Sequence, residues 1–214
     1  MQSKIELKAN HRIVFIGDSI TDADRRDPAY QPLGNGYVHF AGNVLVARHP
    51  QLNLEIINAG VSGDTTRGMK QRWERDCIEH KPDVLSVLIG INDLWTQHAG
   101  SDYLPYAVYA DEYEFTYRLL LSEAREKCGC KFVLIEPFMF CADLNNPMLK
   151  DLRNYIAAVH RLAREFDAVL VRLQSGIDKE IMEVNQERWS IDMVHPYMWA
   201  HAWIAQKWLD AMIL

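Results

Sequence analysis

Short apolar runs alternate with longer, more polar segments along the whole chain. The runs are rich in Ile, Val and Leu, a composition typical of strands that are buried on both faces of a parallel sheet. They cover residues 13–17, 54–59, 84–90, 132–136 and 168–173. We therefore predict five parallel strands, with crossover helices in the segments between them.

Two of these segments carry apolar residues at helical spacing. The segment 147–166 opens with Asn146, a suitable N-cap, and with Pro147, which is well tolerated at the first helical position. Its predicted buried stripe is Leu149, Leu152, Ile156, Val159, Leu162 and Phe166. The corresponding face of 111–128 is Tyr113, Tyr117, Leu120, Leu121, Ala124 and Cys128.

The C-terminal part of the chain predicts two more helices. Ser175 with Asp178 resembles a capping box, which predicts a short helix that ends near residue 187. Pro196 is predicted to start the last helix. That helix would turn its tryptophans, Trp199, Trp203 and Trp208, toward the core.

Alternation of strands and helices on this scale predicts a three-layer α/β/α sandwich around a five-stranded parallel sheet, with residues 1–214 as one domain. The segments 18–35 and 93–110 look irregular, and each directly follows a predicted strand. Open parallel sheets bind their ligands beyond the carboxyl ends of the strands. We therefore expect these two segments to border a site.

Charge and composition narrow the function classes. A formal charge of −6 and a pI near 5.7 argue against a nucleic-acid partner, which requires a concentrated basic surface. The first ten residues place charges where a signal peptide needs an apolar stretch, and no apolar run is long enough to span a membrane. We expect a cytoplasmic protein with reduced cysteines and no membrane partner.

Ser19 is the best candidate for a nucleophile, because it lies just past the first predicted strand. A serine hydroxyl needs a base within hydrogen-bond reach. His195 is the one histidine of eight with a carboxylate three residues earlier, at Asp192. That carboxylate can accept the Nδ1 proton of the imidazole and leave Nε2 free to take the serine proton. The three residues predict a Ser-His-Asp triad.

The tetrahedral intermediate of acyl transfer also needs hydrogen-bond donors for its oxyanion. Three groups that follow predicted strands can supply them. They are the backbone N–H of Ser19, the backbone N–H of Gly63 and the side-chain amide of Asn92. The predicted reaction is acyl transfer to water, on a small-molecule ester.

Four sequence blocks in this order resemble the SGNH or GDSL hydrolase family. They are Gly-Asp-Ser-Ile at 17–20, the glycine block at 58–65, Gly-Ile-Asn-Asp at 90–93 and Asp-Met-Val-His-Pro at 192–196. The resemblance implies a flavodoxin-like fold, the catalytic roles given above, and no metal or organic cofactor. It also makes assembly into a homo-oligomer plausible.

Longer stretches are similar to the subgroup of this family that removes acetyl groups from xylan and xylo-oligosaccharides. They include Leu-Gly-Asn-Gly-Tyr-Val at 33–38 and Ile-Gly-Ile-Asn-Asp-Leu-Trp at 89–95. The resemblance implies an acetylesterase that acts on acetylated sugars. Trp95, Tyr103 and Trp189 are the candidates for sugar contacts, because polar-edged aromatic rings stack on sugar faces. Packing in the core is the alternative for each of them.

Two other functions remain open at this stage. A lysophospholipase or acyl thioesterase would use the same triad with an apolar channel for a long acyl chain. A non-catalytic carbohydrate-binding domain would have no use for Asp192 behind His195. Outside these motifs, Arg72 and Trp73 follow the glycine block, and we expect core packing there unless they shape the site.

Overall fold

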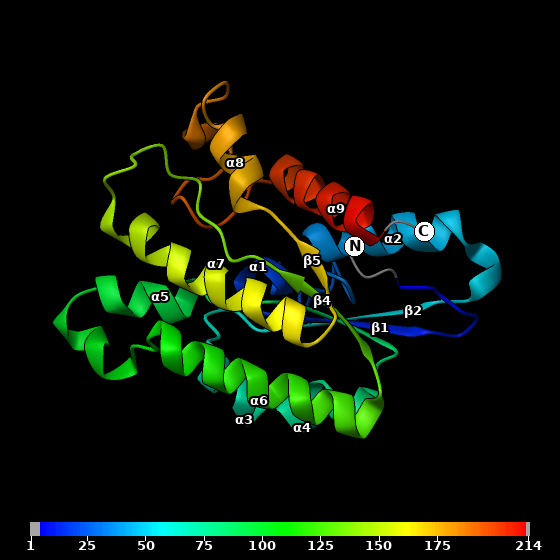
Figure 1. The fold of residues 1–214 in the computed structure, drawn as a ribbon. Coiled ribbons are helices and arrows are strands. Elements are labelled where there is room, and N and C mark those ends of the chain that lie inside the picture. Colours follow the sequence, from blue (N-terminus) through cyan, green and yellow to red (C-terminus); the bar gives the residue numbers. More distant parts are fainter. Residues whose placement is uncertain (1–4, 213–214) are drawn as a thin grey trace.

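The computed structural model describes residues 5–212, which form a five-stranded parallel sheet between layers of helices (Figure 1). The strand order is β2-β1-β3-β4-β5. The strands are β1 (Arg12–Gly17), β2 (Glu55–Gly60), β3 (Val84–Leu88), β4 (Lys131–Ile135) and β5 (Val169–Val171). The predicted three-layer α/β fold is confirmed, and each predicted run overlaps its strand, with ends that differ by up to two residues.

Helices α2 and α9 pack together on one side of the sheet, and α3, α4 and α6 lie on the other side (Figure 1). Helix α7 packs against α5, α6 and the strands β4 and β5. The helices are α1 (Ser19–Asp22), α2 (Tyr37–Arg48), α3 (Thr66–Gln71), α4 (Trp73–Asp76), α5 (Ile91–His98), α6 (Ala110–Cys128), α7 (Pro147–Glu165), α8 (Gln174–Glu180) and α9 (Met198–Met212). Short 3-10 turns occupy Pro50–Leu52, Ile78–His80, Ser101–Tyr106 and Gln186–Arg188.

The sheet is held by the apolar side chains that the sequence pattern places on its strands. Ile13, Val14, Phe15 and Ile16 of β1 are all completely buried. Burying a side chain of this size stabilises a fold by roughly 1.5–3 kcal/mol each. From the helix side, Trp208 packs against Phe15 with ring centroids 5.0 Å apart. Strand β1 is therefore anchored in the core up to Gly17, two residues before Ser19.

Several helix predictions are confirmed and others are wrong. Asn146 caps α7 by accepting hydrogen bonds from the backbone N–H groups of Met148 and Leu149, as predicted. The capping box of Ser175 is wrong, because α8 already begins at Gln174. Asp178 instead accepts a hydrogen bond from the Gln174 side chain, and the helix ends at Glu180 rather than near 187.

The last helix begins at Met198 and not at Pro196, because Pro196 is tied to Ser190 in an isolated antiparallel bridge. Trp208 is buried as predicted, Trp203 is half-buried and Trp199 is 45% exposed. The segments predicted as irregular also contain short helices, α1 in 18–35 and α5 in 93–110. Within residues 5–212, no helix has the length and apolar character needed to cross a membrane.

Candidate active site

Three side chains from distant parts of the chain form a hydrogen-bonded series at the carboxyl edge of the sheet. Ser19 Oγ lies 2.9 Å from His195 Nε2, and His195 Nδ1 lies 2.6 Å from Asp192 Oδ2. The other oxygen of Asp192 accepts hydrogen bonds from the backbone N–H groups of Val194 and His195 and from the Ser190 hydroxyl. The carboxylate is thus held on both oxygens, and the ring is oriented with Nε2 toward the serine.

The position of Ser19 follows from the local structure after β1. Asp18 is the N-cap of α1, and its carboxylate accepts a hydrogen bond from the backbone N–H of Ile20 at 3.0 Å. Ser19 is the first residue of this helix, where backbone N–H groups have no acceptor within the helix. Its own N–H is therefore available for a ligand.

Two further donors stand at the ends of the neighbouring strands. Gly63 adopts a φ of +79°, a conformation that favours glycine, in the loop after β2. Asn92, at the start of α5, donates one amide hydrogen to the backbone carbonyl of Asp64 at 2.9 Å. An amide carries two hydrogens, so a second one remains for a ligand.

A cavity of about 590 Å³ joins these groups. Ser19, Gly63, Asn92 and His195 all line it, so the predicted nucleophile, base and oxyanion donors share one pocket. Asp192 lies behind His195. The rest of the lining is Ile20, Ala23, Asp24, Asn35, Ser62, Pro196, Tyr197, Met198 and His201.

The charge states in the pocket follow from burial and hydrogen bonding. Burial works against a charge on Asp192, but hydrogen bonds from His195 and from the nearby backbone lower its pKa to about 2. Asp192 is therefore ionised at neutral pH. Burial lowers the pKa of His201 to about 4, so this ring is neutral. His201 Nδ1 accepts a hydrogen bond from the backbone N–H of Tyr37, which places the proton of the neutral ring on Nε2.

Two carboxylic acids lie buried beneath the site. Burial raises the pKa of Asp18 to about 7, and the charges of Asp93 and Asp64 act in the same direction. Burial also raises the pKa of Asp93 to about 7, against hydrogen bonds donated by Thr66. One oxygen of Asp18 is buried without a hydrogen-bond partner, which fits a protonated acid better than a carboxylate.

The predicted sugar-contact residues lie elsewhere. Trp95 and Tyr103 are 42% and 44% exposed and form an edge-to-face pair with centroids 4.9 Å apart, outside the lining of the pocket. Trp189 does not line the pocket, and its prediction as a pocket residue is wrong. It is only 2% exposed, because it packs against Phe140 and Trp199 in the core.

Reasoning from the sequence missed several lining residues, above all Asp24, Asn35 and His201. The loop 18–35 was expected at the site, but its pattern does not say which side chains turn inward. For His201 a signal existed, since it lies six residues after His195 and faces the same end of the sheet from the first turn of α9.

Comparisons with known proteins identify the family. The model of the GDSL-like lipase/acylhydrolase family matches residues 15–203. The chain belongs to this family. An acetylxylan esterase from Geobacillus stearothermophilus is 34% identical over 213 residues, which cover 96% of this chain and 95% of that protein. Like that relative, the chain is a carboxylic ester hydrolase.

The solved structures point to the same relative. A crystal structure of acetylxylan esterase from Geobacillus stearothermophilus aligns with a TM-score of 0.91 and 32% identity, over 98% of this chain and 97% of that chain. Variants of the same enzyme described as catalytic mutants replace a serine, an aspartate or a histidine by alanine. A variant of it that is described as an acetyl-xylooligosaccharide esterase aligns equally well, with a TM-score of 0.91 at 33% identity.

Proposed function

We propose that this esterase removes acetyl groups from acetylated xylo-oligosaccharides through an acetyl-enzyme on Ser19. The observation that carries the proposal is the hydrogen-bonded series from Ser19 through His195 to Asp192, with Gly63 and Asn92 in the same pocket. The acetylxylan esterase described above supports the choice of substrate.

In the first half of the proposed reaction, Ser19 Oγ attacks the acetyl carbonyl carbon while His195 Nε2 takes the hydroxyl proton. The carbonyl oxygen becomes an oxyanion and is bound by the N–H groups of Ser19 and Gly63 and by the Asn92 amide. When the intermediate collapses, the bond to the sugar oxygen breaks. His195 protonates that oxygen, so a neutral sugar hydroxyl leaves.

In the second half, His195 removes a proton from water, and the hydroxide attacks the acetyl carbon of the ester on Ser19. The same donors bind the second oxyanion. The bond to Ser19 Oγ then breaks, His195 returns the proton to Ser19, and acetate leaves. Asp192, ionised throughout, stabilises the imidazolium that forms twice in each cycle.

The lining of the pocket supports a polar leaving group rather than a long acyl chain. Asp24 supplies a carboxylate acceptor, Asn35 an amide, and His201 a neutral ring with its proton on Nε2. Such groups suit the hydroxyls of a sugar. A lysophospholipase or long-chain thioesterase needs a continuous apolar channel, and these three side chains would be desolvated by a lipid tail.

We extend the proposal to the exposed pair of Trp95 and Tyr103. Trp95 lies on α5 three residues after Asn92, and Tyr103 lies on the 3-10 turn that follows. Both rings are outside the lining of the pocket, so they suit sugar units beyond the one that carries the acetyl group. All four cysteines are free thiols, which fits the reducing cytoplasm that we propose as the location.

Release of acetate from acetylated xylo-oligosaccharides tests the substrate. The expected result is turnover that exceeds the hydrolysis of lysophospholipids and long-chain acyl thioesters. Trp95→Ala is expected to raise KM for an acetylated xylotriose by about fivefold, the loss of roughly 1 kcal/mol of ring contact. Phe115→Ala, which removes another exposed aromatic ring, is the matched control and leaves KM unchanged.

Faster hydrolysis of a lipid or thioester substrate would make the proposed substrate class wrong while leaving the triad intact. Equal KM values for the Trp95 and Phe115 variants would show that the pair of Trp95 and Tyr103 does not contact the sugar.

A further inference from the structure

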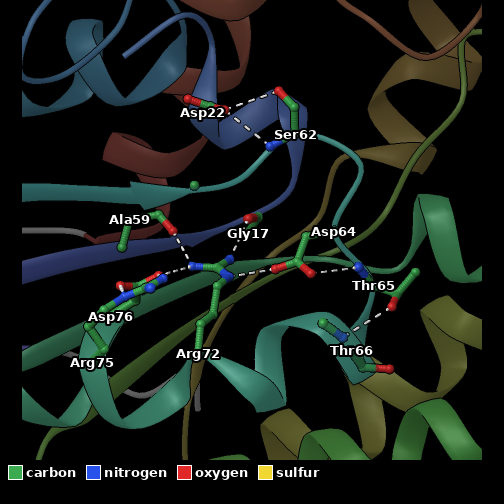
Figure 2. A network of polar contacts seen from close by, with 12 residues as sticks. Gly17, Asp22, Ala59, Ser62, Asp64, Thr65, Thr66, Arg72, Arg75 and Asp76 are labelled. Atoms are coloured by element: carbon green, nitrogen blue, oxygen red, sulfur yellow. Dashed lines mark hydrogen bonds and ion pairs between the residues drawn. The ribbon is translucent and has the colours of Figure 1, made fainter. Parts of the chain in front are cut away.

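A buried guanidinium lies under the edge of the sheet that carries the site (Figure 2). Arg72 joins α3 to α4 and is 8% exposed. Its Nη2 donates to the backbone carbonyl of Gly17 at 3.0 Å, and its Nη1 donates to the carbonyl of Ala59 at 2.6 Å. Nε donates to Asp64 Oδ2 at 2.6 Å, and Nη1 also contacts Asp76. One side chain therefore links the ends of β1 and β2 to the loop after β2.

Two of these links, to Gly17 and to Asp64, end close to predicted oxyanion donors. Gly17 ends β1 two residues before Ser19, the first residue of α1. Asp64 directly follows Gly63. The carbonyl of Asp64 is also the acceptor for the Asn92 amide, at 2.9 Å. A displacement of Asp64 would therefore disturb two of the three donors, the Asn92 amide that bonds its carbonyl and the N–H of the adjacent Gly63.

The side chain of Asp64 is closely confined. Its second oxygen accepts a hydrogen bond from the backbone N–H of Thr65 at 3.1 Å. A Cβ atom at Gly68 would stand 1.9 Å from that oxygen, so only glycine fits there without displacing the carboxylate. Burial raises the pKa of Asp64, and the adjacent charge of Arg72 opposes that rise. The guanidinium thus favours the ionised form of Asp64, against the effect of burial.

We propose that Arg72 is a positioning residue of the oxyanion hole: through Gly17 and Asp64 it fixes the Ser19 and Gly63 N–H groups and the Asn92 amide relative to one another. The inference rests on the proposed function. Arg72 itself touches no reacting atom. Its contribution is expected in kcat, because donors aimed at the oxyanion act on the transition state more than on the bound ester.

The test compares Arg72→Ala, Arg72→Lys and Arg75→Ala on p-nitrophenyl acetate. Arg75 is the matched control, since it lies on α4 three residues after Arg72 and pairs with Asp76 but hydrogen-bonds to neither strand end. Arg72→Ala is expected to lower kcat by about 10²-fold, the loss typical of one misplaced oxyanion donor, with KM changed by less than about threefold. Arg75→Ala retains wild-type kcat.

Added methylguanidinium distinguishes positioning from general stability. It can occupy the space left by the Arg72 side chain. It is expected to raise the kcat of Arg72→Ala about tenfold and to leave Ser19→Ala inactive. Arg72→Lys keeps the charge but cannot reach both carbonyls and Asp64 together, so its kcat is expected between those of wild type and Arg72→Ala. All rates are expressed per folded molecule, from circular dichroism and thermal unfolding.

Wild-type kcat in folded Arg72→Lys, or a loss in Arg72→Ala that merely follows the unfolded fraction, would overturn the inference. Failure of the proposed function has a different signature, since wild type would then show no turnover that depends on Ser19. In that case the side-chain amide signal of Asn92 in a ¹H–¹⁵N spectrum tests whether Arg72 positions this amide. It is expected to shift in Arg72→Lys and not in Arg75→Ala, and equal spectra would overturn the inference.

Discussion

The Ser19 hydroxyl depends on groups that lie up to 176 residues away in the sequence. Its hydrogen-bond partner His195 is oriented by Asp192, which is itself held by backbone N–H groups and by Ser190. This arrangement fixes the tautomer, because Nδ1 must carry the proton that Asp192 accepts. The lone pair at Nε2 then faces the serine.

Asp192→Asn tests this orientation. An amide at this position can donate to Nδ1 and so stabilise the wrong tautomer, and the same change in a trypsin-type enzyme lowers kcat by about 10⁴. We expect a loss of about 10³–10⁴ in kcat with the fold retained, measured on p-nitrophenyl acetate. Asp151→Asn is the matched control, since Asp151 also pairs with a histidine, His98, but on the surface away from the pocket. A loss of less than tenfold in kcat for Asp192→Asn would show that Asp192 does not orient His195.

At the scale of elements, the strands are the part that composition dictates. Runs of Ile, Val and Leu bounded by polar segments have few alternatives to burial on both faces, so all five were predictable. The ends of short helices are harder to predict from the sequence. Helix α5 follows the N-cap residue Gly90, whose φ of +129° cannot be read from the sequence, and α8 starts one residue before the apparent cap at Ser175. Tertiary contacts decide such boundaries.

The N-cap of helix α1, Asp18, is expected to make the stability of the protein depend on pH. In the unfolded chain Asp18 ionises near its ordinary pKa of 3.8, whereas burial raises the pKa in the folded chain to about 7. Between these values the folded state holds a proton that the unfolded state has lost. The stability that Asp18 contributes is therefore complete below pH 3.8 and is lost as the pH rises toward 7.

Urea unfolding of wild type and Asp18→Asn across this pH range measures the effect. Relative to the variant, the free energy of unfolding of wild type is expected to fall by up to about 1.4 kcal/mol per pH unit. Asp27→Asn, at an exposed position in the following loop, is the control and keeps the slope of wild type. Parallel curves for Asp18→Asn and wild type would show that Asp18 ionises alike in both states.

At the scale of the whole molecule, the sheet brings the sequence blocks together. Because parallel strands end at one edge, the segments after β1, β2 and β3 meet there. The segment before α9 adds His195, and α9 adds His201. Ser19, Gly63 and Asn92 could be predicted to meet at this edge, because each follows a strand closely in the sequence. The polar lining at Asp24 and Asn35 could not, because loop side chains have no period.

The central claim is that Ser19 is the nucleophile of an acetylesterase. Hydrolysis of p-nitrophenyl esters from acetate to laurate, by wild type and Ser19→Ala, tests it most directly. We predict activity that is greatest on acetate, falls steeply with chain length and is absent from the Ser19→Ala variant. Turnover that peaks on medium or long chains would contradict the acetyl preference. Turnover that persists in Ser19→Ala, or none in wild type on any ester, would contradict the nucleophile itself.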